Sequence, residues 1–156
     1  MNKQKVFLAI LIFCNLLTLC YGQLNDKEGS SIRLVNSEFF FSIYDDLDIV
    51  INKIGEPKSD YNEDSKVYTL TWENGLVIQA INKHYICFIK INSNNFQTEK
   101  GVCVGDSFSK VYKIYGNPQF KYDTILTYNM NIDKGTIIVF MFENNKVKEI
   151  IIGYGS

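Results

Sequence analysis

The stretch "VGDSFSKVYKIYGNP", Val104 to Pro118, has the features of one short helix with defined ends. Asp106 or Ser107 can cap its first turn, because a short polar side chain accepts a hydrogen bond from a free backbone N–H. Gly116 and Pro118 are typical of a helix end, since glycine adopts the left-handed conformation and proline cannot continue the helix. Between these ends, apolar residues recur at the spacing of one buried helix face; they are Phe108, Val111, Tyr112 and Tyr115.

A second stretch of the same form, "IYDDLDIVINKIGEP" at Ile43 to Pro57, aligns with the first without a gap. Each stretch is followed by a run that reads as three strands joined by hairpin turns. The turns are placed at Asn74–Gly75 and Lys83–His84 in one run, and near Asp133–Gly135 and at Asn144–Asn145 in the other. We therefore predict an α+β fold, a tandem duplication of an αβββ unit whose helices pack on one face of an antiparallel sheet. The two repeats span residues 38–95 and 96–156 and form one compact domain.

Residues 1–22 have the form of a signal peptide, because Lys3 and Lys5 precede an apolar run. Two processing routes are compatible with the sequence. Cleavage after Gly22 suits ordinary signal-peptide removal, whereas "LTLC" resembles a lipoprotein box in which Cys20 would be acylated. The chain is therefore predicted to be exported, as a periplasmic or secreted protein or as a membrane-anchored lipoprotein. Residues 23–37 are polar and are predicted to form a tether or an edge segment.

The charge balance argues against two classes of partner. The formal net charge is −1 and no basic run occurs. We therefore expect neither nucleic acid nor an anionic membrane surface as a partner, so that contact with a membrane would require the lipid anchor. In an exported protein Cys87 and Cys103 could form a disulfide across the loop between them, and a buried free thiol is the alternative.

No motif for catalysis or for cofactor binding is present. The one histidine, His84, falls in a predicted hairpin turn, where a solvated loop residue is expected. The acidic run "DDLD" (Asp45, Asp46 and Asp48) is interpreted as helix capping rather than as a metal site, since carboxylates complement the helix dipole. The sequence therefore predicts no enzyme, no metal ligand and no cofactor.

Two-residue turns at Asn74–Gly75 and Lys83–His84 would decide which residues share a face of the sheet. One face would then be aliphatic and covered by a helix; it carries Leu76, Ile78, Ala80, Cys87, Ile89 and Ile91. The opposite face would be rich in aromatic residues, as protein-binding surfaces are. Its candidate partner-binding residues are Tyr68, Trp72, Phe88, Phe140 and Phe142. The alternative is that another part of the chain covers this face.

The run "KGVCVGDSFSKVYKIYGNP", a strand bearing tyrosine, and then "FMFENNKVKEIII" resemble the units of the BLIP-like fold. That group includes the tandem-repeat beta-lactamase inhibitory proteins and the single-unit BamE/SmpA outer-membrane lipoproteins. The resemblance implies an antiparallel sheet with helices on one face and a protein that binds other proteins. We accordingly expect a non-enzymatic protein-binding module, an inhibitor or an envelope assembly factor. The alternative is a structural lipoprotein subunit held at the membrane through Cys20.

Overall fold

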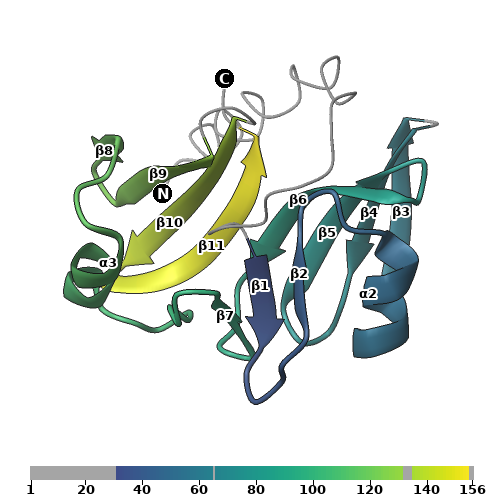
Figure 1. Ribbon diagram of the computed structural model, residues 1–156, viewed down its shortest axis with the longest axis horizontal. Helices are drawn as coiled ribbons and strands as arrows, with labels where there is room; N and C mark the ends of the chain where they lie inside the picture. Colours follow the sequence, from purple (N-terminus) through teal and green to yellow (C-terminus); the bar gives the residue numbers. More distant parts are fainter. Residues whose placement is uncertain (1–30, 65, 132–134, 155–156) are drawn as a thin grey trace.

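The computed structural model describes residues 31–64, 66–131 and 135–154. The described residues form two sheets and two short helices (Figure 1). Neither helix is long or apolar enough to cross a membrane, within these three ranges. The elements in chain order are β1 (Ser31–Leu34), β2 (Phe40–Ser42), α2 (Leu47–Ile54), β3 (Ser59–Asp64), β4 (Val67–Thr71), β5 (Leu76–Ile81), β6 (Tyr85–Ile91), β7 (Phe96–Thr98), α3 (Phe108–Tyr115), β8 (Phe120–Tyr122), β9 (Ile125–Asn131), β10 (Thr136–Glu143) and β11 (Lys146–Tyr154).

The large sheet has eight antiparallel strands in the order β3-β4-β5-β6-β11-β10-β9-β8. Strands β6 and β11 pair at its centre, where Ile150 lies opposite Ile91. The small sheet has the order β2-β1-β7. Figure 1 shows the small sheet between α2, which lies beside β3 and β4, and α3, which lies beside the ends of β10 and β11.

Both helices begin and end where the sequence predicts. Asp46 caps α2 by accepting a hydrogen bond from the Asp48 N–H at 2.9 Å, and Ser107 caps α3 by accepting one from Lys110. Gly55 and Gly116 have φ angles of 93° and 77°, and their N–H groups bond to the last turn of each helix. The predicted capping role of the acidic run is therefore confirmed at Asp46.

The predicted fold class is wrong, because the chain is mostly β and is not a pair of αβββ units. Each helix has only eight residues and is followed by four strands of the large sheet. The extra strand β3 is polar in sequence and β8 has only three residues, so both lack the apolar alternation that predicts a strand. Strand β7 joins a sheet with β1 and β2, so the small sheet combines strands from the predicted tether and from both predicted repeats.

The segment predicted as a tether or edge has a different role where it is described. Ser31–Leu34 is β1, the middle strand of the small sheet. Ile32 is fully buried, as are Phe41 of β2 and Phe96 of β7, whose rings meet edge to face at 6.3 Å. The predicted signal peptide, both cleavage alternatives and residues 23–30 lie outside the described residues.

One face of the large sheet forms the core. Strands β4, β5, β6, β9, β10 and β11 contribute buried side chains to it, and α2, α3 and the small sheet pack against them. The sheet residues of this core face are Leu70, Trp72, Leu76, Ile78, Ala80, Ile86, Ile89, Ile91, Leu126, Tyr128, Ile138, Phe140, Phe142, Val147, Ile150 and Ile152.

Candidate functional site

The predicted aromatic binding face is not a surface. Trp72 is 5% exposed, Phe140 is 0% exposed and Phe142 is buried as well. Tyr115 of α3 meets the Phe140 ring edge to face at 4.9 Å, and Phe108 of the same helix meets Phe142 at 5.0 Å. The expectation that Trp72 and Phe140 are accessible to a partner is therefore wrong, because they lie beneath the helices.

Register explains the error in the first hairpin. The loop between β4 and β5 contains Glu73, Asn74 and Gly75, and Trp72 bonds to Leu76 across it. A three-residue loop shifts the pairing by one residue relative to a two-residue turn, and a shift of one residue moves every side chain of a strand to the other face. Strand β4 therefore turns Leu70 and Trp72 toward the core.

Two β-bulges explain the remaining differences between the predicted and the observed faces of the sheet. Gln79 pairs with Phe88 and Ala80 with Ile86, so Cys87 is an extra residue in β6. In the same way Lys148 is extra in β11, where Met141 pairs with Glu149 but Phe142 pairs with Val147. Each bulge reverses the alternation in part of its strand, which places Ile86 and Val147 in the core.

The other predicted site residues occupy separate environments. Tyr68 is half-buried on the core side of β4, with the Lys83 ammonium 4.7 Å above its ring. Phe88 is half-buried on the opposite side of the sheet. Cys103 is a free thiol whose pKa is raised by burial, and no disulfide joins it to Cys87. Cys20, the predicted lipidation site, lies outside the described residues.

The face of the large sheet opposite the core is here called the open face. Its residues follow from the pairing register, because residues opposite one another in adjacent strands share a face. Most are half-buried, as expected for a sheet surface that no other described element covers. The open face comprises Val67, Thr69, Thr71, Val77, Gln79, Ile81, Phe88, Lys90, Glu149, Ile151, Ile137, Val139, Met141, Ile125, Thr127, Asn129, Phe120 and Tyr122.

Strand β8, at one edge of the large sheet, carries two exposed aromatic residues. Phe120 is 69% exposed and Tyr122 is 67% exposed, and both point to the open face. Lys121 points to the other side, where its ammonium lies 5.3 Å from the centre of the Phe108 ring. The opposite edge, β3, has the acid-rich sequence SDYNED, and charge is a common protection of sheet edges against pairing. Strand β8 carries a single charge, Lys121, between its two aromatic residues.

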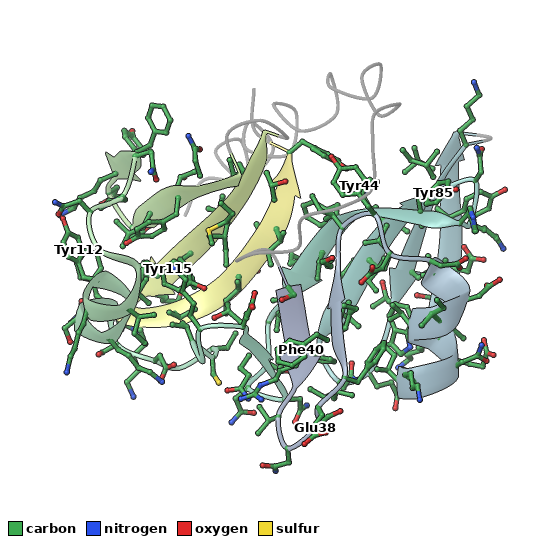
Figure 2. All side chains as sticks on the ribbon, viewed as in Figure 1. Glu38, Phe40, Tyr44, Tyr85, Tyr112 and Tyr115 are labelled. Carbon is green, nitrogen blue, oxygen red and sulfur yellow. The ribbon has the colours of Figure 1, made fainter. Side chains whose placement is uncertain are left out.

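A cleft of about 450 Å³ lies beside the start of β8. The floor is aromatic, since Tyr115 reaches it from α3 and Tyr128 from β9; Figure 2 shows Tyr115 beside the strands of the sheet. The Lys100 ammonium lies 4.9 Å above the Tyr115 ring. Gln119 accepts a hydrogen bond from the Asn129 N–H at 2.9 Å, which satisfies an edge amide of β9 beyond the end of β8.

Both tyrosine hydroxyl groups of the cleft keep their protons at neutral pH. Burial raises the pKa of Tyr115 to about 12 and that of Tyr128 to about 12. The Tyr128 hydroxyl donates to the Gly116 carbonyl at 3.2 Å. The Tyr115 hydroxyl lies beside Thr98 but has no hydrogen bond of acceptable geometry to the described residues. The Tyr128 hydroxyl proton is thus used inside the fold and the Tyr115 hydroxyl is buried, so the two tyrosines offer aromatic contacts to the cleft rather than hydrogen-bond donors.

No protein-family model and no curated protein matches this chain. Among solved structures, the fold is similar to that of an extracellular protein containing an SCP domain from Bacillus anthracis, with a TM-score of 0.51 and 11% identity. That alignment covers 86% of this chain and 49% of the other. A cysteine-rich secretory protein from Staphylococcus aureus aligns with a TM-score of 0.49 and 11% identity, over 86% of this chain and 51% of the other. The chain thus spans about half the length of each.

These comparisons correct the predicted family. The similar structure from Bacillus anthracis contains an SCP domain and is neither a beta-lactamase inhibitory protein nor a BamE-like lipoprotein, so the resemblance to the BLIP-like fold is wrong. The motifs behind it were a helix cap, a helix stop and an Asn-Asn turn, which the structure does contain. Such local signals recur in many folds because they follow from backbone geometry rather than from ancestry.

Sequence reasoning missed the β8 edge. Phe120 and Tyr122 follow Pro118 in a stretch of only three strand residues, too short for alternation to be recognised. The available signal was a pair of aromatic residues flanking a lysine directly after a helix stop. Their exposure depends on β8 being the last strand of the sheet, which the sequence does not reveal.

Proposed function

We propose that this protein is an exported, non-enzymatic protein-binding module that binds its partner at the β8 edge. Export is supported by the signal-like residues 1–22. It is supported also by the similar fold from Bacillus anthracis, which belongs to a protein described as extracellular.

The chemistry of the cleft supports binding rather than catalysis. Its lining includes no histidine, cysteine or serine. A tyrosine whose pKa is about 12 is a poor base or nucleophile near neutral pH, since its phenolate is rare there. His84 lies elsewhere, with Nδ1 3.2 Å from the Asp46 carboxylate and its ring against Tyr85. We therefore assign the cleft to recognition.

The observation that carries this proposal is the exposure of Phe120 and Tyr122 on an edge strand. Edge strands bind extended segments of other proteins through backbone hydrogen bonds, and side chains on both sides of the added strand supply specificity. Here an added strand would meet the two aromatic rings on one side of the sheet. On the other side it would pass close to the cleft beneath α3.

Site-specific photo-crosslinking in the cells that produce the protein tests this proposal. A photoreactive phenylalanine analogue replaces Phe120 or Tyr122 in the full chain, and the matched control places it at Tyr85, which is 49% exposed. We expect a covalent adduct with a different protein from the two β8 positions and not from Tyr85. Equal labelling at all three positions, or none at β8, would contradict the proposal.

Alanine replacement provides a second measurement. The double variant Phe120→Ala, Tyr122→Ala should lose capture of the cross-linked partner, because exposed aromatic residues at an interface centre dominate binding energy. It should keep its melting temperature, since neither ring is buried in the core. The identity of the captured protein separates two finer proposals: an enzyme would indicate an inhibitor, and an envelope component an assembly factor.

The intact mass of the exported chain separates the two processing proposals. Cleavage after Gly22 gives an unmodified chain, whereas acylation gives a shorter removed segment and a lipid on Cys20. A lipid-bearing mass would support the membrane-anchored alternative.

A further inference from the structure

The centre of the open face carries an unpaired charge of each sign. Lys90 lies on β6 and Glu149 lies on β11, the two central strands of the large sheet. Both side chains are half-buried. Neither forms an ion pair with a described residue. By contrast, the Lys110 ammonium, on the core side of the sheet, lies 2.7 Å from the Asp106 carboxylate. An amine and a carboxylate that are partly desolvated gain from pairing when a partner of opposite charge is supplied.

The surroundings of these two charges are apolar. Ile151 lies opposite Lys90 on the neighbouring strand and two residues from Glu149 on its own strand. Val77 lies opposite Lys90 on the other side, and Val139 lies opposite Ile151. Further out, Gln79 and Thr69 hydrogen-bond to each other at 3.2 Å. The centre of the open face is therefore mainly aliphatic around its two charges, whereas the solvated face of a sheet is expected to be polar.

We propose that the open face binds a second copy of this chain, so that two large sheets stack face to face in a symmetric dimer. A two-fold axis that lies between the sheets and passes midway between Lys90 and Glu149 brings Lys90 of each copy against Glu149 of the other. Stacked sheets are separated by about 10 Å, a gap that extended lysine and glutamate side chains bridge together. One surface thus supplies both members of two identical ion pairs.

The area of the open face is large enough for a dimer interface. Seven of the eight strands, leaving out the β8 edge, are spaced about 4.8 Å apart and are each about six residues long at about 3.3 Å per residue, so they present roughly 700 Å² per copy. Two copies would bury roughly 1,400 Å² in all, within the range of specific protein–protein interfaces. The aromatic pair on β8 lies at the margin of the face, so this inference rests on different residues from the proposed partner site.

Charge exchange tests the dimer. Sedimentation or light scattering of the exported chain, from about 1 to 100 µM, measures its dissociation constant. We expect Lys90→Glu and Glu149→Lys each to weaken dimerisation about 30-fold or more, because each replaces two attractive pairs with two repulsive ones. The double variant Lys90→Glu, Glu149→Lys should restore the dimer, which no loss of folding can imitate.

Two results would overturn the inference. A chain that remains monomeric throughout this range has its open face free or covered by another segment or partner. A dimer that is insensitive to both single exchanges associates through another surface. Either result leaves the β8 proposal standing if the cross-links from Phe120 and Tyr122 persist, so the two proposals fail independently.

Discussion

At the scale of single residues, two aromatic side chains from the large sheet donate hydrogen bonds to carbonyl groups at the ends of the helices. The Trp72 indole N–H donates to the Gly55 carbonyl at 2.7 Å, and the Tyr128 hydroxyl donates to the Gly116 carbonyl at 3.2 Å. Carbonyl groups at a helix end lack intrahelical partners, so these bonds satisfy acceptors that would otherwise need water. Trp72, which was predicted to bind a partner, therefore stabilises a helix end inside the molecule.

Trp72→Ala should destabilise the protein by about 3–5 kcal/mol, because it removes a large buried side chain and leaves a cavity. Trp72→Phe keeps an aromatic ring but loses the indole bond to Gly55, which contributes about 1 kcal/mol. Urea denaturation of both variants measures the two free energies of unfolding. An Ala variant as stable as the parent would show that Trp72 is on the surface after all.

Stability should fall as pH rises through the range set by the two buried tyrosines. In the unfolded chain a tyrosine loses its proton near pH 10, whereas the pKa of Tyr115 and that of Tyr128 are raised to about 12 in the fold. The unfolded state therefore binds fewer protons between pH 10 and 12, so stability is fully present below pH 10 and is lost across that range.

Thermal unfolding between pH 9 and 12 measures this loss. In Tyr115→Phe the slope of melting temperature against pH should become shallower, because one of the two titrations is removed. Replacing the exposed Tyr122 by Phe is the matched control and should leave the slope unchanged. Identical slopes in all three proteins would contradict the assignment.

At the scale of elements, helix ends and hairpin loops depend on glycine for different reasons. At Gly116, with φ 77°, an added Cβ would meet nothing within 4 Å. At Gly75, with φ 84°, it would collide with the Asn92 side chain and approach the Ser93 Cβ to 2.7 Å. Gly116 is thus required by backbone conformation alone, and Gly75 by conformation and by a close approach.

Gly75→Ala should therefore destabilise the protein more than Gly116→Ala, which should cost about 1 kcal/mol. Gly116→Val should cost at least as much as its alanine counterpart, and Gly55→Val should behave like it, since the surroundings of Gly55 are equally open. Melting temperatures of the four variants check the order. If Gly75→Ala proves the mildest, the three-residue loop is not formed as described.

At the scale of the whole molecule, one sheet face makes the core and the other is left to solvent or to partners. The helices and the small sheet cover the same face, although they come from distant parts of the chain. Strand β7 pairs with β1, and β6 pairs with β11, so each sheet depends on pairing between strands that are far apart in sequence. The two proposed surfaces, the β8 edge and the open face, exist only because of this arrangement.

The sequence by itself determined the local elements. Helix caps at Asp46 and Ser107, helix stops at Gly55 and Gly116 and the turn at Asn144–Asn145 follow from backbone preferences of a few adjacent residues. Tertiary structure alone decided which face each strand buries. A loop one residue longer at Glu73–Gly75 and bulges at Cys87 and Lys148 each shift the alternation by one residue, and such shifts depend on packing across the whole sheet. For that reason Trp72 and Phe140 became core, while the exposed pair Phe120 and Tyr122 appeared only once β8 was placed at the edge.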